Sequence, residues 1–401
     1  MSDLTSEPVV TAPASLRLRD TVWLASTGEG SLEAGLGGGG ALVRIHVHTA
    51  CLRTDDDRHT GSAGSAWLLK ACCDPLPDLA ASFQREVGFY ELLLADETAQ
   101  LLAVPRCRLA LRQPPIGHHE QPPGGTPSSG FSLVLEDLRE LGFHTASMDA
   151  GLSLAQTSTV LRQLATFHAR FAGIAGEPEP PVLALTTAQL AAKADIHCTP
   201  QALGAFVSHY CSDCTAEERE GFDSAMRAAL EHGAGRLFAA AVDRAGGLIS
   251  LNHGDVHPLN LMFGSSSGEV PEVRLVDFAD IAWTSPAYDV QQCLSCCLDA
   301  ASRRTHESQL LQEYTDALHR CNPRLMKGGW DGEVFASAVQ TLGALSCLQI
   351  AGYFGGEKVK QLREDGEGLR LDATVSPLAA RLVAMASDGD ENLQELAATL
   401  H

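Results

Sequence analysis

The sequence predicts an α+β protein of two lobes. The amino-terminal lobe is expected to hold an antiparallel β-sheet and one helix, and the carboxy-terminal lobe to be mainly helical with one β-hairpin. Three observations lead to this prediction. The 401 residues are too many for one small core. Strand-like patterns dominate up to residue 138, and helical periodicity dominates from residue 139. The only later strand-like stretch is residues 248–278.

The amino-terminal lobe is predicted to cover residues 17–138, after a loose tail over residues 1–16. Residues 20–47 read as strand, glycine-rich turn and strand, and with the next strand they predict an antiparallel meander. The later strand patterns of this lobe lie at residues 66–71, 103–111 and 131–138.

A helix is expected over residues 82–97, between these strands. Phe83, Val87, Tyr90 and Leu94 recur at intervals of three and four, which places them on one stripe of a helix. Glu86 lies within one turn of Phe83 and Tyr90, so its carboxylate borders the buried face.

The glycine run Gly35–Gly40 formally fits a dinucleotide-binding pattern. Such a fold needs a helix after the glycines, whereas the next residues, ALVRIHV, read as a strand. Two interpretations stay open for the run: a hairpin loop that covers a nucleotide, and a plain flexible linker.

The carboxy-terminal lobe is predicted to cover residues 139–401. Residues 157–171 carry an apolar helical stripe, and His168 on it is interpreted as a satisfied core histidine. A later helix is expected to begin with a capping box formed by Thr215 and Glu218 and to end at Gly233. Within residues 248–278, two apolar segments flank a glycine- and serine-rich turn, as in a hairpin.

Charge and hydropathy narrow the possible partners. The net charge of −21 makes nucleic acid an unfavourable general partner, because so acidic a surface repels phosphate backbones. No stretch of about 20 apolar residues is evident, and the opening MSDLTSEPVV lacks the pattern of a signal peptide. A cytoplasmic protein without a membrane partner is therefore expected.

The twelve cysteines are interpreted as reduced thiols in such a chain. Cys211 and Cys214 form one CxxC pair, but no second pair or paired histidine completes a zinc set. Cys293, Cys296 and Cys297 are spaced as on a helix, where buried thiols pack as small apolar groups. Packing is favoured over metal binding for both groups.

The segment NHGDVHPLNLMF contains the residues with the clearest chemistry. Asp255 and Asn260 are five positions apart, and Asp277 follows at the end of an apolar strand. Phosphoryl transfer from a nucleotide requires a carboxylate that orients or deprotonates the acceptor hydroxyl, oxygen ligands for magnesium, and a cation on the phosphates. Lys70 can supply that cation, and Glu86 can hold the lysine in place by ion pairing.

Neighbouring polar residues of this segment are given structural roles. His253 and His257 are expected to stiffen the loop through hydrogen bonds rather than to bind zinc, because no third ligand is evident. Asp289 follows Ser285 and Pro286 at an expected helix start. Serine is common as a cap, proline in the first turn and aspartate near the positive end of a helix, so a structural role explains all three.

These motifs resemble the aminoglycoside phosphotransferase/choline kinase-like superfamily and, within it, most closely the ecdysteroid kinase-like (CHK kinase-like) family. HGDVHPLN at 253–260 and LVDF at 275–278 carry the resemblance. Further blocks in the family's order are LLK at 68–70, FQREVGFYELL at 83–93, LVLEDL at 133–138, LATFHA at 164–169 and SPAYDV at 285–290. Ala279-Asp280 and about the last hundred residues fall outside the resemblance.

The resemblance implies a bilobal protein-kinase-like fold and transfer of the γ-phosphate of ATP, with Mg²⁺, to a hydroxyl of a small metabolite. It implies Asp255 as catalytic base, Asn260 and Asp277 as magnesium ligands, Lys70 as phosphate contact and Glu86 as its partner. The hinge that faces the adenine would be Glu136, Asp137 and Leu138.

Two other functions are alternatives to this one. A nucleotide-binding pseudokinase that acts as a scaffold would keep the same cleft without transfer. A protein kinase would normally carry an activation segment ending in A-P-E, for which SPAYDV leaves little room after Asp277. The oligomeric state and the identity of the acceptor are not encoded in any of these patterns.

Overall fold

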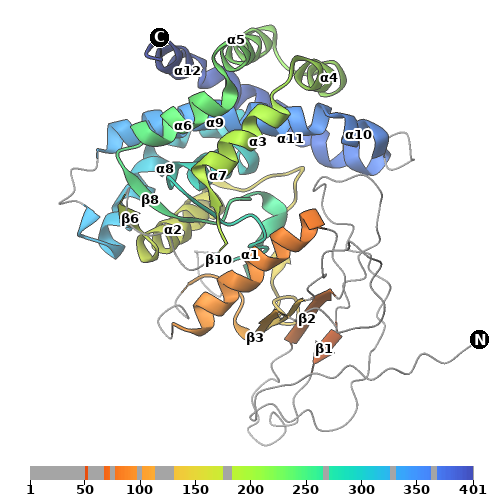
Figure 1. Ribbon diagram of the computed structural model, residues 1–401, viewed down its shortest axis with the longest axis vertical. Helices are drawn as coiled ribbons and strands as arrows, with labels where there is room; N and C mark the ends of the chain where they lie inside the picture. The colour runs from red at the N-terminus through yellow and green to blue at the C-terminus, as the bar shows by residue number, and fades with distance from the viewer. Residues whose placement is uncertain are drawn as a thin grey trace, which may run out of the picture.

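The protein has the predicted two lobes, seen in a computed structural model that describes residues 50–52, 67–72, 77–96, 102–112, 131–174, 183–264, 271–325, 331–362 and 368–400. A small sheet with one helix, α1, lies at one end of the molecule, and a larger body of helices lies at the other (Figure 1). The prediction of a bilobal, kinase-like α+β fold is therefore confirmed. The exact lobe limits, 17–138 and 139–401, stay a prediction.

The sheet of the amino-terminal lobe has four strands: β1 (Ala50–Leu52), β2 (Trp67–Cys72), β3 (Cys107–Arg112) and β4 (Phe131–Glu136). Their order is β1-β2-β4-β3, and each neighbouring pair is antiparallel. Lys70 on β2 lies opposite Leu133 on β4, in the middle of the sheet. The strands expected over residues 20–47, and the glycine run within them, lie outside the described residues.

The predicted helix of this lobe is α1 (Pro77–Leu94). Val87 and Tyr90 of its predicted stripe are fully buried, and Phe83 is almost so. Leu94 is 47% exposed, so its predicted place in the buried stripe was wrong. It is the last residue of the helix, which explains its exposure. Phe89 lies off the predicted stripe but is fully buried against the carboxy-terminal lobe, where its ring stacks on Phe278.

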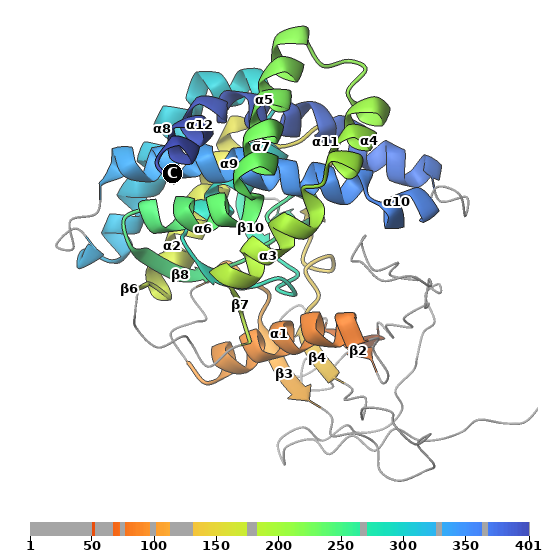
Figure 2. The ribbon, with the colours of Figure 1, turned by 45° about the horizontal axis from the view of Figure 1, so that its top comes forward.

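The carboxy-terminal lobe is built from eleven helices in the described residues. They are α2 (Leu154–Arg170), α3 (Thr187–His197), α4 (Pro200–Tyr210), α5 (Ala216–His232), α6 (Ala234–Arg244), α7 (Ala287–Cys297), α8 (Ala300–Cys321), α9 (Gly332–Gly355), α10 (Glu357–Leu362), α11 (Gly368–Asp388) and α12 (Asp390–Ala398). The predicted capping box of Thr215 and Glu218 begins α5, and Gly233 ends it. Figure 2 shows most of these helices gathered around α9.

The central helix α9 corrects one expectation from the sequence. It is long and apolar enough, by length and composition alone, to cross a membrane. However, 67% of its most apolar window is buried against the other helices, which is what the core helix of a globular lobe requires. The prediction that the chain has no apolar stretch of about 20 residues was therefore wrong. The helix nevertheless belongs to the core of the lobe.

The predicted hairpin is formed by β9 (Leu261–Gly264) and β10 (Glu272–Leu275), which pair antiparallel. β8 (Leu248–Asn252) precedes it. The lobe also contains β5 (His144–Thr145), β6 (Gly173–Ile174), β7 (Leu185–Thr186) and β11 (Ala282–Thr284). Residues 248–278 are thus not the lobe's only strand-like stretch, because these strands of two or three residues are too short to show a period in the sequence.

Candidate active site

The loop between β8 and β9 places Asp255 and Asn260 side by side. It closes with a short 3₁₀ turn over Pro258–Asn260. The amide nitrogen of Asn260 donates to the main-chain oxygen of Asp255 at 2.9 Å and to its Oδ2 at 3.0 Å. His257 Nε2 also contacts Oδ2, at 3.3 Å. No described residue bonds Oδ1, and the Asp255 side chain is 46% exposed, so this carboxylate is open to a ligand.

The β9–β10 hairpin brings Asp277 to the same end of this loop. Leu261 pairs with Leu275. The antiparallel pairing continues by one residue beyond the strands, because Val276 N donates to the main-chain oxygen of Asn260 at 3.0 Å. Asp277 follows at once, with φ of 68°. A non-glycine residue in this left-handed region is strained, and such strain is typical of functional positions.

The side chains of Asn260 and Asp277 fit a magnesium ion. Both side-chain hydrogen bonds of Asn260 that the structure describes use Nδ2, which leaves the side-chain oxygen Oδ1 for a cation. Asp277 adds a carboxylate, and Mg²⁺ prefers such hard oxygen ligands, usually one or two from the protein with the rest from phosphates and water. Their role as magnesium ligands stays a prediction.

Lys70 and Glu86 form the predicted ion pair. Lys70 Nζ donates to Glu86 Oε2 at 2.6 Å, and the Glu86 side chain is only 2% exposed. Burial lowers the pKa of Lys70, but the carboxylates of Glu86 and Asp277 outweigh this and hold its pKa above the ordinary value. Lys70 is therefore a permanent cation that lies within the electrostatic reach of Asp277. Burial raises the pKa of Glu86, against the opposing effect of Lys70.

The segment predicted as a hinge follows β4 directly. Glu136 is buried, and its carboxylate accepts from Arg106 Nε at 2.7 Å, so the side chain is already engaged. The main-chain oxygen of Leu138 accepts from Leu141 N and Phe143 N, which closes a tight turn after Asp137. Glu136 N also donates to the oxygen of Arg106, so part of this backbone is already engaged. Its contact with an adenine stays a prediction.

Two side chains of α7 hold the backbone of residues 253–260 between β8 and β9, which are called the catalytic loop after their predicted role. Asp289 Oδ2 accepts from His253 N at 2.6 Å, and Oδ1 accepts from Gly254 N at 2.8 Å. One helical turn later, Gln292 accepts from Val256 N at 2.9 Å and donates to Gly254 O at 3.1 Å. The loop conformation that presents Asp255 is therefore set from the core of the carboxy-terminal lobe.

Asp289 is in turn fixed by a buried chain of polar groups. His168 Nε2 lies 3.0 Å from Asp289 Oδ2, and its Nδ1 lies 2.8 Å from Tyr314 Oη. A carboxylate only accepts, so Nε2 donates to Asp289; in a neutral ring, Nδ1 then accepts from Tyr314. Burial raises the pKa of Tyr314, which keeps its hydroxyl proton for this bond. His168 is thus the satisfied core histidine that the sequence suggested.

Sequence reasoning missed the importance of Asp289 and did not consider Gln292. Asp289 was interpreted as an ordinary residue of a helix start, yet it is fully buried and binds the loop. The available signal was the spacing: a carboxylate and an amide three positions apart, after SPAY, lie on one helix face.

The two histidines of the loop make the hydrogen bonds expected of them. His253 Nε2 lies 2.9 Å from the oxygen of Val276, and its ring packs on Phe278 with centroids 4.7 Å apart. His257 pairs with Asp255. In the part of the chain that the structure describes, no group of three His, Cys, Asp or Glu side chains is placed to hold a metal ion.

Gly254 is required by the approach of two backbones. Its φ is +88°, and a Cβ added there would lie 1.8 Å from the oxygen of Asp280. We expect Gly254→Ala to destabilise the folded protein by about 3 kcal/mol or more, because left-handed strain adds to this overlap. Urea unfolding measures it. Gly204→Ala on α4 is the matched control, since open space surrounds that position; equal stability of the two variants would contradict the geometry.

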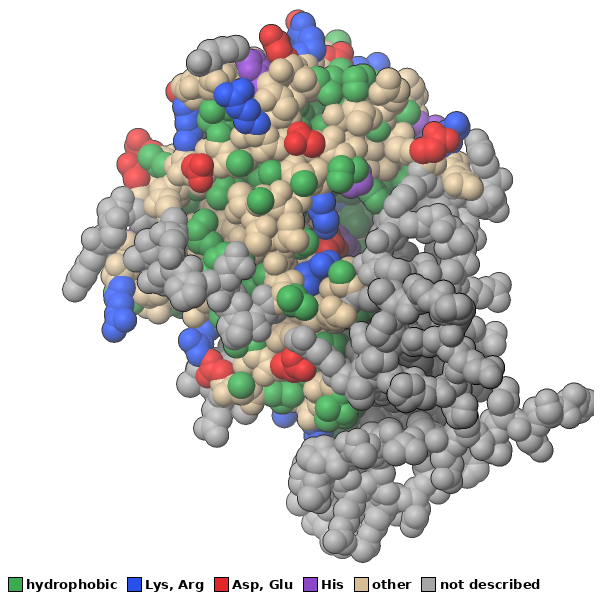
Figure 3. Space-filling model, viewed as in Figure 1, with side chains coloured by type: hydrophobic (Ala, Val, Ile, Leu, Met, Phe, Trp, Pro, Cys, Tyr) green, Lys and Arg blue, Asp and Glu red, His purple; other side chains and the backbone are tan. Residues whose placement is uncertain are grey.

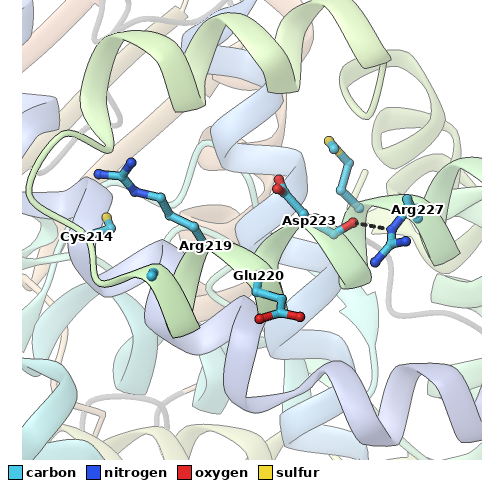
Figure 4. A pocket seen from close by; sticks show the side chains of 7 residues that line it. Cys214, Arg219, Glu220, Asp223 and Arg227 are labelled. Carbon is cyan, nitrogen blue, oxygen red and sulfur yellow. Dashed lines mark hydrogen bonds between the residues drawn. The ribbon is translucent and has the colours of Figure 1, made fainter.

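An open groove lies elsewhere in the part of the chain that the structure describes. It has a volume of about 780 Å³ and is lined by Cys214, Ala216, Arg219, Glu220, Asp223, Met226 and Arg227 (Figure 4). Its charged side chains come from α5 and are of both signs, and Arg227 bonds the backbone of its own helix at Asp223. None of the predicted site residues lines it. The groove therefore does not compete with the catalytic loop as the candidate site.

The three cysteines of α7 show the packing expected of them. Cys293, Cys296 and Cys297 are buried on α7 as free thiols, and burial raises the pKa of Cys296 to about 12. Cys211 and Cys214 are also free.

Comparison with known structures gives several similar chains, including the following three. A microcompartment-associated aminopropanol kinase is 15% identical, with a TM-score of 0.40 over 85% of this chain and 90% of that chain. A choline kinase from Streptococcus pneumoniae is 13% identical, with a TM-score of 0.39 over 87% and 92%. A Plasmodium vivax ethanolamine kinase is 12% identical, with a TM-score of 0.43 over 84% and 80%.

No curated protein sequence matches the chain. The family comparison gives a match that extends over residues 78–326 and includes α1, the catalytic loop, the hairpin and α7. This stretch is more than half of the 401 residues. The chain therefore belongs to the ecdysteroid kinase-like family.

Proposed function

We propose that this protein is an ATP-dependent small-molecule kinase that transfers the γ-phosphate to a hydroxyl of a small metabolite. One observation carries the proposal: a half-exposed carboxylate, Asp255, is held by Asn260 beside the end of the hairpin that presents Asp277. The partly buried Lys70–Glu86 pair lies within electrostatic reach of the same Asp277. These are the groups that phosphoryl transfer requires.

Each residue has one task in this proposal. Asp255 Oδ1 accepts the hydrogen bond of the acceptor hydroxyl and takes its proton as the oxygen attacks the γ-phosphorus, while the bond from that phosphorus to the bridging oxygen breaks and ADP leaves. Lys70, held by Glu86, contacts the phosphates as a permanent cation. Asn260 and Asp277 would hold Mg²⁺, which would neutralise charge on the β- and γ-phosphates. The backbone from Glu136 to Leu138 would face the adenine.

The acceptor is expected to be an alcohol, an amino alcohol, a sterol or an aminoglycoside-like compound. A panel of such compounds, incubated with ATP and Mg²⁺ and analysed by mass spectrometry, tests the proposal: one product gains the mass of a phosphoryl group. The alternative function, a nucleotide-binding scaffold, predicts magnesium-dependent ATP binding without any phosphorylated product.

His257 gives the proposed activity a pH dependence. Burial lowers the pKa of His257, but Asp255 and Asp277 outweigh this and raise it above the ordinary 6.5. Partial desolvation of the Asp255 carboxyl favours its neutral form, but protonated His257 at Oδ2 outweighs this and lowers the pKa of the carboxyl, which makes Asp255 a weaker base. We therefore expect kcat to rise as the pH increases through the raised pKa of His257. In His257→Asn, this limb is lost and activity at low pH increases.

The pH–rate profile of the parent and the variant measures this effect. His306→Asn on α8 is the control histidine and is expected to keep the parent profile. An unchanged profile in His257→Asn would show that another group sets the acid limb.

A further inference from the structure

One face of α1 binds the segment that follows Asp277. Arg85 Nε donates to the main-chain oxygen of Ala279 at 2.7 Å, and Arg85 Nη2 contacts Asp280 Oδ1 at 3.1 Å. One turn later on the same face, the ring of Phe89 stacks on Phe278 with centroids 4.0 Å apart. Three consecutive residues after Asp277 are therefore fixed to one helix of the other lobe.

In the polar part of this contact, Arg85 is shielded from solvent but Asp280 is not. The Arg85 side chain is 10% exposed, and its Nη2 also donates to Ser82 Oγ at 2.9 Å. Asp280 is 40% exposed and shares its carboxylate with Lys193 of α3, at 3.5 Å. Solvent screens the ion pair with Asp280. The bond from the guanidinium to the Ala279 oxygen is the stronger constraint, because it is charge-assisted and partly buried.

Arg85 lies directly before Glu86 in α1, so it connects the segment after Asp277 to the residue that holds Lys70. The next residue is Glu86, which is rotated by about 100° around the helix and holds Lys70. A single turn of α1 therefore fixes the phosphate-binding lysine through Glu86 and the metal-binding segment through Arg85.

The segment after Asp277 is also pressed against the catalytic loop. The oxygen of Asp280 lies where a Cβ of Gly254 would be, so the two backbones touch. The segment thus lies between α1 and the loop that carries Asp255. In Figures 1 and 2, α1 and α3 lie on either side of the boundary between the lobes, and Figure 3 shows basic and acidic side chains together in the middle of this face.

We propose that Arg85 is a positioning residue, which locks the segment Phe278–Asp280 onto α1 and thereby fixes Asp277 relative to the Lys70–Glu86 pair. Asp280 and Lys193 complete the lock from the carboxy-terminal lobe. This inference rests on the proposed kinase function for its effect on ATP and Mg²⁺, but the lock itself is a property of the folded chain. Residues Ala279 and Asp280, which fall outside the resemblance to the family, gain a role in it.

The variant Arg85→Met tests the lock, because methionine keeps an apolar stem and leaves the Phe89–Phe278 contact in place. Without nucleotide, we expect backbone amides of residues 278–281 to exchange hydrogen about tenfold faster, since a charge-assisted bond is lost from a local structure. In a protein that transfers phosphate, kcat falls about 10- to 100-fold, because small misplacements of reacting groups have effects of this size. The Mg²⁺ concentration needed for half-maximal ATP binding rises, while KM for the acceptor changes little.

Two further variants sharpen the test. Arg85→Lys keeps the charge but not the fork of donors, and is expected to recover part of the loss. Arg304→Met is the matched control, since Arg304, like Arg85, bonds partners outside its own helix, in this case Asp388 and Glu218, far from the catalytic loop. It should leave exchange at residues 278–281 and the Mg²⁺ dependence as in the parent.

The outcomes separate the lock from the proposed function. Unchanged exchange at residues 278–281 in Arg85→Met overturns the lock, whether or not the protein binds ATP. Faster exchange with an unchanged Mg²⁺ dependence of ATP binding overturns the positioning role. If the parent binds no ATP, the proposed function fails, and hydrogen exchange alone decides whether Arg85 holds the segment.

Discussion

Replacing Asp255 by asparagine is expected to lower kcat about 10²- to 10⁴-fold, the contribution typical of a general base. Asparagine has nearly the same shape and can still accept the bond from Asn260, so the loop should keep its conformation. It cannot take the proton of the acceptor hydroxyl. Because Asp255 is not assigned to the nucleotide, ATP affinity should be unchanged. A product assay with an accepted alcohol measures kcat, and calorimetry measures the binding of ATP with Mg²⁺.

The control for this variant is Asp331→Asn, which changes the exposed cap of α9 in the same chemical way. Its turnover should match that of the parent. Equal turnover in Asp255→Asn and the parent would reject Asp255 as the base. A parent that binds ATP with Mg²⁺ but phosphorylates none of the alcohols tested would instead favour the scaffold function.

The sequence predicted those parts of the site that depend on local patterns. Asp255 and Asn260 are five residues apart in one loop, and the hairpin that follows fixes where Asp277 must lie. Lys70 and Glu86 are separated by 16 residues, on a strand and the helix after it. Their ion pair could be expected because a short connection leaves few ways for the two elements to pack.

Contacts across long stretches of chain could not be predicted in this way. Arg85 and Asp280 are 195 positions apart, and no local period in the sequence links them. Asp289 and Gln292 were equally hidden, because a polar residue on a helix is ordinarily assumed to face water. On α7 every residue is buried, the polar ones included, since the helix passes through the core directly behind the catalytic loop.

Substitution of Asp289, the buried residue that holds the loop, is expected to have an effect as large as substitution of the catalytic carboxylate Asp255. Asp289→Asn should lower the free energy of unfolding by about 2–4 kcal/mol, because one carboxylate oxygen becomes an NH₂ group in a fully buried site. Whichever way the amide turns, this group faces the N–H of His253 or of Gly254. Urea unfolding measures the loss of stability, and kcat should fall even in the fully folded fraction because the loop that carries Asp255 shifts.

The control is Asp299→Asn, the same change at the exposed cap of α8, where asparagine caps a helix about as well as aspartate. Its stability should stay within about 0.5 kcal/mol of the parent. If Asp289→Asn were as stable and as active as this control, the backbone of His253 and Gly254 would not depend on a carboxylate. The orientation of Asp255 would then have to come from within the loop, through Asn260 and His257 alone, and not from α7.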